Sequence, residues 1–406
     1  MEVGEYIVSM ARKARAASAE LARMDTAAKN AALLAVADAL EARRAEIDAA
    51  NREDVEKAKA SGLAPAMVDR LTLTPARFDA MVSGVRRVVE LPDPVGERIW
   101  TRERPSGIRI EKVRVPFGVV AVVFESRPNV FVDTAALCLK TGNAVILRGG
   151  KEALGTNAAL AAAVGSALAP LGAGDAVQLV GITDHAAVTE LVRAVGLVDV
   201  AIPRGGERLI RAMCEAALVP VLKHYKGVCH IYVDKAADQS MALAILDNAK
   251  TQRPGVCNAA ECLLVHEGIA DEFMPKVRAW AEEKGVVLHF DASTAEEWGR
   301  EFLALEMNVG VVRDCRAAVE HINAYGSHHS DCIVTADAER AEEFLRDVDS
   351  AAVYHNASTR FTDGGEFGMG AEIGISTDKL HARGPMGLEE LTTYKYRVTG
   401  DGTVRK

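Results

Sequence analysis

The sequence predicts an α/β protein built on parallel β-sheets. From residue 118 onward, short apolar runs alternate with segments of helical composition, in two successive series. Such alternation is typical of parallel sheets with helices on both faces. The length of 406 residues allows two or three domains, each large enough for its own core. Hydrophobic residues make up 49% of the chain, which argues against disorder.

Composition also excludes several classes of function. The formal net charge of −9 argues against broad binding to nucleic acids or anionic membranes, because both need concentrated positive charge. We find no uninterrupted apolar run of membrane-spanning length, and the charged segment 1–22 lacks the apolar core of a secretory signal. The seven cysteines are odd in number and have no framework spacing, which indicates reduced thiols. We therefore expect a cytoplasmic protein.

The first 91 residues are expected to be helical. Residues 26–60 are rich in Ala, Leu, Glu, Lys and Arg, and their apolar residues recur at steps of three and four. Between 98 and 115, apolar and charged residues tend to alternate on either side of Pro105-Ser106-Gly107, which predicts a two-stranded ribbon. A ribbon with so many charges is either a solvated excursion or a strand offered to a partner subunit.

The remainder of the chain predicts two α/β series and a tail. The first series has strands at 118–124, 143–147, 176–180 and 198–202, with helices at 130–140, 152–168, 184–195 and 207–217. The second has strands at 228–233, 261–265, 309–312 and 331–334, with helices at 236–250, 269–284, 316–325 and 338–346. The tail is Gly-rich from 361 and ends in a predicted edge strand, 391–398. Nucleotides bind such sheets at the carboxyl ends of the strands.

Three loops that follow strands of the first series carry candidate binding residues. The first contains Arg127 and Asn129, the second reads Arg148-Gly149-Gly150-Lys151, and the third contains Arg204-Gly205-Gly206. Glycines allow close backbone approach, and cations near a helix N-terminus suit an anion. Neither glycine segment is a Walker motif or a six-residue dinucleotide fingerprint, so ordinary turns remain the alternative.

Cys257 is the candidate nucleophile. It lies in a Pro-Gly loop between a predicted helix and a predicted strand, and nearby Lys250 and Arg253 would favour the reactive thiolate. We expect about five of the seven cysteines to be small buried hydrophobic residues instead. Cys262 and His266 lack further ligands at zinc-site spacing, so no metal is expected.

Histidines 328 and 329 stand in a loop rich in Ser and Gly. Such histidines are more often solvated than catalytic, and this is the reading we favour here.

Several of these segments resemble known proteins. Residues 118–129, 139–148 and the Cys257 segment follow one another as in the aldehyde dehydrogenase superfamily. Segments 251–258, 318–331 and 370–385 are similar, more narrowly, to the γ-glutamyl phosphate reductases, and the resemblance covers essentially the whole chain. It implies an aldehyde dehydrogenase-like fold with a Rossmann-like NADPH-binding domain (1–95 and 117–227), a catalytic domain (228–384), and a small β oligomerisation element (96–116 and 385–406).

The resemblance also implies a reaction. L-glutamyl 5-phosphate would be reduced by NADPH to L-glutamate 5-semialdehyde and phosphate through a Cys257 thioester, the second step of proline biosynthesis from glutamate. Asn129 and the backbone N–H of the cysteine would stabilise the oxyanion. Arg148 falls at a ribose-binding position and, with Lys151, would suit the 2′-phosphate of NADPH. The other expected cofactor residues are Gly149, Gly150, Arg204, Gly205 and Gly206.

Substrate contacts are expected from Arg127, His224 and Arg253. Oxidising aldehyde dehydrogenases activate water with a Glu in a Glu-Leu-Gly-Gly segment, whereas the corresponding stretch here, 221–230, has no carboxylate. This suits a reductive enzyme, which must keep water off its thioester. Lys223, His224 or Lys226 could instead face the phosphate. The expected partners are the small-molecule substrate and further copies of the chain. An association with glutamate 5-kinase is also considered.

Two other function classes stay open from the sequence. A hydrolytic or CoA-acylating aldehyde dehydrogenase would turn over aldehydes without depending on phosphate. A non-catalytic nucleotide-binding or scaffold protein would keep its function when Cys257 is replaced by Ala.

Overall fold

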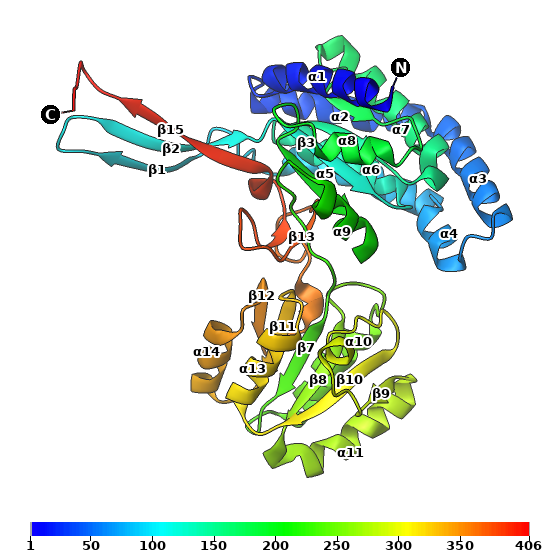
Figure 1. The fold of residues 1–406 in the computed structure, drawn as a ribbon, viewed down its shortest axis with the longest axis vertical. Helices are drawn as coiled ribbons and strands as arrows, with labels where there is room; N and C mark the ends of the chain where they lie inside the picture. Colours follow the sequence, from blue (N-terminus) through cyan, green and yellow to red (C-terminus); the bar gives the residue numbers. More distant parts are fainter. Residues whose placement is uncertain (1, 406) are drawn as a thin grey trace. The chain divides into compact units, whose positions relative to one another are not determined.

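The computed structural model describes residues 2–405, which form two compact units (Figure 1). Unit 1 contains residues 2–222, 368–374 and 386–405, and unit 2 contains residues 223–367 and 375–385. The α/β class expected from the sequence is confirmed, because each unit holds a parallel sheet with helices.

Unit 1 begins with five helices, as the composition predicts. They are α1 (Val3–Leu21), α2 (Thr26–Ala42), α3 (Arg44–Ala60), α4 (Pro65–Leu71) and α5 (Pro75–Glu90). Asp25 caps α2 by accepting a hydrogen bond from the Ala28 amide at 2.8 Å. Pro75 starts α5 at a position where a missing N–H costs nothing, after the capping Thr74. The apolar face of α1 packs on the sheet that follows, whereas α2, α3 and α5 pack against two helices that cover it, α6 (Pro128–Lys140) and α7 (Leu154–Leu168).

The sheet of unit 1 is parallel and has the strand order β5-β4-β3-β6. Its strands are β3 (Val119–Phe124), β4 (Ala144–Arg148), β5 (Val177–Leu179) and β6 (Val200–Arg204), and its helices are α6 (Pro128–Lys140), α7 (Leu154–Leu168), α8 (Ala186–Val192) and α9 (Glu207–Ala216), with 3-10 turns at Lys151–Ala153 and Ala169–Leu171. The chain adds β4 and β5 on one side of β3 and then crosses to β6 on the other. This reversal is a topological switch point, where α/β sheets bind ligands at the carboxyl ends of their strands.

Helix α7 corrects one expectation from the sequence. The stretch Lys151–Leu171 is long and apolar enough to cross a membrane by length and composition, so the search of the sequence missed a candidate span. In the fold, however, α7 packs against α2, α3 and β5. Its Thr156 donates to Asp54 of α3 at 2.7 Å and also accepts a hydrogen bond from Asn51. Only 33% of this apolar window is buried within the chain, and a single such helix is weak evidence for a membrane span.

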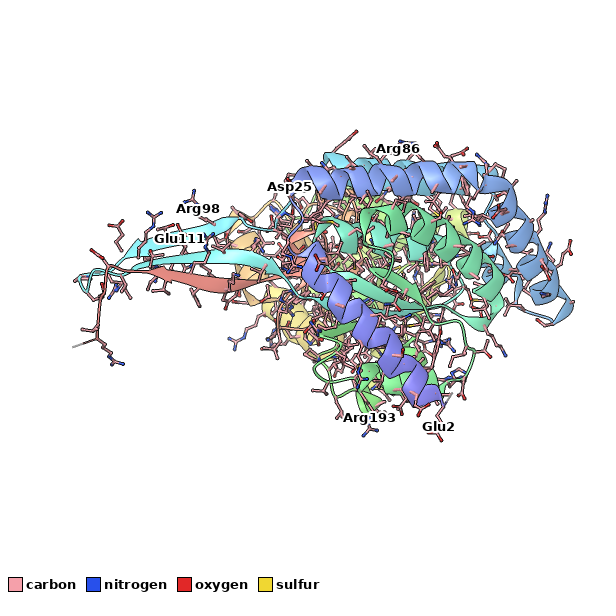
Figure 2. All side chains as sticks on the ribbon, turned by 90° about the horizontal axis from the view of Figure 1, so that it is seen from above. Glu2, Asp25, Arg86, Arg98, Glu111 and Arg193 are labelled. Atoms are coloured by element: carbon pink, nitrogen blue, oxygen red, sulfur yellow. The ribbon has the colours of Figure 1, made fainter. Side chains whose placement is uncertain are left out.

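A three-stranded antiparallel sheet unites two distant segments of unit 1. Its order is β1 (Arg98–Glu103), β2 (Arg109–Pro116) and β15 (Thr392–Thr399), which confirms the predicted ribbon and edge strand. Figure 2 shows it projecting from the helices of unit 1, with Arg98 and Glu111 on it. Most side chains of β1 and β15 are exposed. The sheet therefore contributes little to the core of this chain.

Unit 2 contains a six-stranded sheet in the order β12-β11-β7-β8-β10-β9, with parallel pairing throughout. Its strands are β7 (Cys229–Val233), β8 (Ala260–His266), β9 (Val287–His289), β10 (Glu306–Val312), β11 (Ser330–Val334) and β12 (Ala352–His355), and its helices are α10 (Gln239–Thr251), α11 (Glu267–Lys284), α12 (Ala295–Trp298), α13 (Cys315–Tyr325) and α14 (Ala338–Asp347), with a 3-10 turn at Thr359–Phe361. The sequence did not predict β9 and β12. Both are short edge strands whose side chains are mostly exposed or half-buried, so their pattern is weak.

The observed units differ from the predicted domains at three points. The boundary near 227 falls at 222–223, and the predicted oligomerisation element (96–116 and 385–406) is not a separate unit, because its described residues belong to unit 1 except for residue 385. Residues 368–374, expected in the catalytic domain, also belong to unit 1. Gly370 explains this last difference, because a Cβ there would lie only 2.5 Å from the Leu91 side chain that follows α5. The chain passes between the units through β13 (Gly374–Ser376) and β14 (Gly384–Met386), which pair with each other, and a 3-10 turn at Glu389–Leu391 precedes β15.

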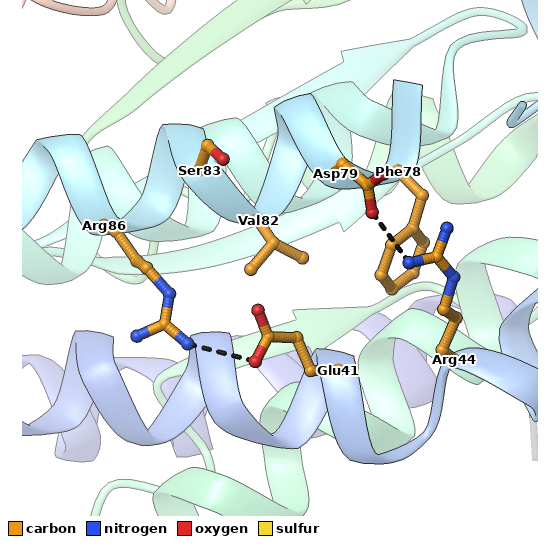
Figure 3. A pocket seen from close by; sticks show the side chains of 7 residues that line it. All are labelled: Glu41, Arg44, Phe78, Asp79, Val82, Ser83 and Arg86. Carbon is orange, nitrogen blue, oxygen red and sulfur yellow. Dashed lines mark hydrogen bonds and ion pairs between the residues drawn. The ribbon is translucent and has the colours of Figure 1, made fainter. Parts of the chain in front are cut away.

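A surface pocket of about 230 Å³ lies between α2 and α5 (Figure 3). It is lined by Glu41, Arg44, Phe78, Asp79, Val82, Ser83 and Arg86. Its charges are already paired: Arg44 with Asp79 at 2.7 Å and Arg86 with Glu41 at 3.1 Å. A pocket whose cations and carboxylates satisfy one another offers no unmet charge to a ligand, and none of the candidate site residues lines it.

Candidate active site

Cys257 lies in the loop between α10 and β8 of unit 2. Its side chain is half-buried, whereas five of the seven cysteines are buried in the core, as expected. The loop is fixed by the next residue, Asn258, whose amide donates to the backbone oxygens of Thr362 at 2.9 Å and Arg360 at 3.3 Å. Thr359 donates in return to the Asn258 carbonyl at 2.7 Å. The candidate nucleophile therefore stands on a rigidly tethered turn.

A second segment passes directly behind the Cys257 backbone. A Cβ added to Gly227 would lie 1.7 Å from the carbonyl oxygen of Cys257, so only a hydrogen atom fits there. The Gly227 amide donates to a carboxylate oxygen of Glu301 at 2.8 Å, and the Cys229 thiol donates to the Cys257 carbonyl at 3.3 Å. The cysteine loop is thus in contact with the 223–230 segment on its backbone side.

Two imidazoles lie next to the Cys257 thiol. One ligand atom from each of His224, Cys257 and His329 falls within 4.8 Å of the other two. Nδ1 of His224 is 2.8 Å from the carbonyl oxygen of Ile375. Because a carbonyl only accepts, Nδ1 of His224 carries a proton.

His329 is completely buried, and the expectation that this histidine is solvated is wrong. Burial, and then the neighbouring His224, lowers the pKa of His329 to about 3, so its ring stays neutral. Its Nδ1 is 2.8 Å from Ser330 Oγ, which in turn bonds to Thr362 Oγ1 at 2.6 Å, and the Tyr354 hydroxyl bonds to the same Thr362 at 2.7 Å. This buried chain of hydroxyls fixes the ring. The signal in the sequence was the position of His329 directly before a buried strand.

The cations around Cys257 differ from those expected. Lys250 is fully buried and pairs with Glu261 at 2.9 Å, so its charge is neutralised within the core and the predicted role at the thiolate is wrong. Burial raises the pKa of Glu261 to about 7, against the effect of Lys250. Arg253 is exposed.

Arg360 is a cation that the sequence analysis missed. It donates from Nε to Gln252 at 2.8 Å and from its terminal nitrogen to the side-chain oxygen of Asn258. Burial and then Arg253 lower the pKa of Arg360, while the charge of a Cys257 thiolate would raise it. The positive charge of Arg360 and the negative charge of a Cys257 thiolate therefore stabilise each other, and the thiolate is the nucleophilic form of cysteine. No local pattern marks it, because it reaches the cysteine loop from 103 positions further along the chain.

The 223–230 segment holds its other polar groups in pairs. Lys223 bonds to Asp378 at 2.8 Å, and the Lys226 ammonium donates to the Gly299 carbonyl. Of Lys223, His224 and Lys226, His224 is the residue that lies in the cluster at the Cys257 thiol. The segment has no carboxylate of its own, but Glu301 supplies one to its Gly227 amide, a contact that the sequence does not reveal.

In unit 1, the loop after β3 carries Arg127 and Asn129. Ser126 adopts a left-handed conformation (φ 36°), and Arg127 is the N-cap residue directly before α6. Asn129 donates one of its two amide hydrogens to Asp133, one turn on, at 2.9 Å. Burial raises the pKa of Asp133 to about 6, and the hydrogen bond from Asn129 opposes this. Asp133 therefore orients the Asn129 amide at the edge of the sheet.

The loop after β4 contains Arg148, whose guanidinium is turned back onto the protein. Its two terminal nitrogens donate to the carbonyls of Gly149 at 3.1 Å and Thr183 at 3.2 Å, and only 7% of the residue is exposed. Its Nε is buried without a hydrogen-bond partner. A Cβ at Gly149 would lie 2.2 Å from the Asn157 side chain, so close packing also explains a glycine at this position. Lys151, by contrast, is exposed.

The loop after β6 contains the remaining candidate cofactor residues. The Gly206 amide donates to Glu125 at 3.0 Å, and a Cβ at Gly205 would lie 2.7 Å from the same carboxylate, whereas at Gly206 it would meet open space. At Gly150 a Cβ would clash with Glu152, at 2.1 Å. The unpaired Nε of Arg148 and the open space beside Gly206 fit an anionic ligand at this sheet edge. The carboxylates of Glu125 and Glu152 lie at the same edge.

The structure thus gathers the candidate residues in two places. Unit 2 brings Cys257 and His224 together and adds His329, with Arg253 and Arg360 around the same loop. Unit 1 carries the other candidates, Arg127 and Asn129 included, on three loops at the carboxyl ends of neighbouring strands. That the two sets act on one substrate stays a prediction.

Comparisons with known proteins agree with this fold. The model of the aldehyde dehydrogenase family matches residues 4–295. The chain is similar to the γ-glutamyl phosphate reductase of Thermotoga maritima, with 45% identity and a TM-score of 0.96, over 98% of this chain and 100% of that one. It is also similar to the γ-glutamyl phosphate reductase of Saccharomyces cerevisiae, with 32% identity and a TM-score of 0.56, over 98% of both chains. An acetylating aldehyde dehydrogenase from Geobacillus thermoglucosidasius, at 17% identity and a TM-score of 0.71 over 100% of this chain and 98% of that one, shares the fold.

Proposed function

Because the chain belongs to the aldehyde dehydrogenase family, we propose that it reduces L-glutamyl 5-phosphate to L-glutamate 5-semialdehyde and phosphate with NADPH, in proline biosynthesis. The protein is an oxidoreductase of this family. The observation that carries the choice of substrate is the similarity, over the full length, to two γ-glutamyl phosphate reductases. The half-buried Cys257 thiol beside the two imidazoles of His224 and His329 supports the chemistry.

The first half of the proposed reaction forms a thioester. His224 accepts the Cys257 proton on Nε2, since its Nδ1–H is held by the Ile375 carbonyl. The thiolate attacks the acyl carbon, and the carbon–oxygen bond to phosphate breaks. The His224 imidazolium faces the leaving group and gives its proton to it, so that phosphate departs as HPO₄²⁻. His224 thus combines the phosphate contact expected from the sequence with deprotonation of the thiol. Asn129 and the backbone amide of Cys257 stabilise the oxyanion.

The second half of the proposed reaction releases the aldehyde and regenerates the free cysteine. When bound, the cofactor supplies the hydride that reduces the thioester carbon. Hydride addition leaves an alkoxide on the former carbonyl oxygen. The carbonyl re-forms as the carbon–sulfur bond breaks, the aldehyde leaves, and the Cys257 thiolate regains a proton from solvent through His224. Water must stay away from the thioester throughout. The 221–230 segment supports this, because it lacks a carboxylate of its own and the Glu301 carboxylate is hydrogen-bonded to the Gly227 amide.

Aldehyde dehydrogenases use nicotinamide dinucleotides, and the preference for NADPH belongs to the proposal. Exposed Lys151 is the better candidate for the 2′-phosphate, because the Arg148 guanidinium is mostly occupied by backbone carbonyls. For the substrate we propose Arg127 and Arg253, whose charge suits its carboxylate.

The change Lys151→Ala tests the cofactor proposal. We expect the KM for NADPH to rise about tenfold, the cost of one charged hydrogen bond, and the KM for NADH to stay the same. Steady-state kinetics with both cofactors would measure this, with exposed Lys13→Ala of α1 as the control. An equal rise for both cofactors would remove Lys151 from the 2′-phosphate site.

The proposal extends to assembly and location. We propose a cytoplasmic homo-oligomer that uses the β1-β2-β15 sheet, whose edge strand β15 exposes Tyr394, Tyr396 and Val398 to about half of their full extent. A hand-over of the unstable acyl phosphate from glutamate 5-kinase is proposed on chemical grounds alone.

One assay separates the function classes. NADP reduction by glutamate semialdehyde is measured with phosphate, with CoA, and with neither. We expect activity that requires phosphate, because the reverse reaction must form the acyl phosphate. Activity without phosphate would favour a hydrolytic enzyme and activity with CoA an acylating one. A folded protein without activity under any condition would favour the scaffold.

A further inference from the structure

The residues around the Cys257 thiol have a second capacity that the reductase reaction does not use. His224, Cys257 and His329 each place one potential ligand atom within 4.8 Å of the other two. In a tetrahedral zinc site, bonds of about 2.0–2.3 Å put such atoms roughly 3.5 Å apart. Shifts of about an ångström would therefore convert the trio into a coordination shell. His224 and Cys257 are half-buried and lie in loops, where shifts of this size are tolerated.

Both imidazoles are prepared as ligands by their other nitrogen. His224 donates Nδ1–H to the Ile375 carbonyl at 2.8 Å, the arrangement by which proteins orient a metal-binding histidine. His329 contacts Ser330 Oγ through Nδ1, while its Nε2 is buried and has no hydrogen-bond partner. The side chain of His329 is completely buried, so solvent does not satisfy this nitrogen. A ligand that accepts a lone pair would do so.

We propose that His224, Cys257 and His329 form a reversible site for a thiophilic divalent cation of the Zn²⁺ class, which blocks the reductase by binding its nucleophile. Two imidazole nitrogens and one thiolate are a donor set that suits Zn²⁺ and Cd²⁺ and disfavours Mg²⁺ and Ca²⁺. Binding replaces the thiol proton, which is released to solvent, with a metal–sulfur bond, and no oxidation takes place. Three protein ligands leave a fourth position for water.

The sequence did not predict this site because its ligands come from three separate segments. The potential ligands that lie near Cys257 in the chain are Cys262 and His266. In the fold, Cys262 is buried in β8 and its thiol faces the Trp298 carbonyl at 3.6 Å, while His266 accepts the Gly268 amide at 2.9 Å. The ligands proposed here lie 33 positions before Cys257 and 72 positions after it.

The experiment measures metal binding itself. The reduced, EDTA-treated full chain is titrated with Zn²⁺ and, separately, with Mg²⁺ by calorimetry, and the Cys257 thiol is followed by its rate of alkylation by iodoacetamide. We expect one Zn²⁺ per chain, no Mg²⁺ binding, and protection of the thiol that EDTA reverses. The rate of NADPH oxidation should fall in proportion to Zn²⁺ occupancy and recover with EDTA.

Variants decide whether the three residues are the ligands. We expect Cys257→Ala to abolish binding, and His224→Ala and His329→Ala each to weaken it by at least about 100-fold. His224 is half-buried, so His224→Ala still tests the site should the buried His329→Ala fail to fold. Cys214→Ala, which removes the other half-buried thiol, should bind Zn²⁺ as the unmodified chain does.

Two results would overturn the site: no Zn²⁺ binding at micromolar concentrations, or binding that survives Cys257→Ala. The inhibitory effect rests on the proposed function, but the binding does not. A chain that binds Zn²⁺ through these residues and reduces no acyl phosphate would refute the reductase and leave the metal site intact.

Discussion

Replacing Cys257 by Ala is expected to lower the rate of L-glutamyl 5-phosphate reduction by roughly 10⁴-fold or more, the scale seen when a nucleophile is removed from an enzyme that works by covalent catalysis. The physical reason is that no thioester can then form, and the hydride has no adequate acceptor. The fold should be unaffected, because the side chain is half-buried and leaves a cavity of only one sulfur atom. Single-turnover kinetics and circular dichroism would measure both quantities.

Cys214→Ala is the matched control for this experiment. Cys214 is the other half-buried cysteine and lies on α9 of unit 1, so its loss should leave kcat unchanged. A folded Cys257→Ala protein that kept a tenth of the activity would rule out the thioester route. Loss of activity in Cys214→Ala alone would instead point to a second reactive thiol.

Much of the fold could be predicted because burial on both faces leaves a local mark. Strands such as β3 and β4 are continuous apolar runs, and the helices of unit 1 begin at recognisable caps and prolines. Edge strands such as β9 leave no such mark, since only part of each is buried. The helix predicted at 152–168 is confirmed as α7, although its length and apolar composition alone would also allow a membrane span.

The candidate site was predictable only where chemistry and loop position coincide. Cys257 stands out in its Pro-Gly loop, but Lys250 looked like its partner and is in fact paired with Glu261 in the core. The sequence places Lys250 at the end of a predicted helix and Cys257 in the loop after it, but it does not show that the Lys250 side chain is buried in the core. His329 and Arg360 reach the cysteine loop through tertiary contacts alone, which no local pattern encodes.

The change Gly227→Ala is expected to lower kcat by roughly 100-fold although it adds a single methyl group, which would meet the backbone of Cys257. The new Cβ would stand 1.7 Å from the carbonyl oxygen and 2.4 Å from the carbonyl carbon of Cys257. No flexible side chain can yield at this contact, since both partners are backbone. The cysteine loop must therefore move, and a displacement of about 1 Å at the nucleophile is enough to lose the aligned attack on the acyl carbon.

The steric cost should also appear in stability, with a fall of about 1–3 kcal/mol in the free energy of unfolding. Gly165→Ala is the matched control, because a Cβ at this position in α7 meets nothing within 4 Å. It should leave kcat unchanged and stabilise the chain by roughly 0.5–1 kcal/mol, as is usual within a helix. Kinetics, urea unfolding and the alkylation rate of Cys257 would be compared for both variants. A Gly227→Ala protein with unchanged kcat and stability would mean that the loop yields without cost, and the close packing behind Cys257 would then not be what positions the nucleophile.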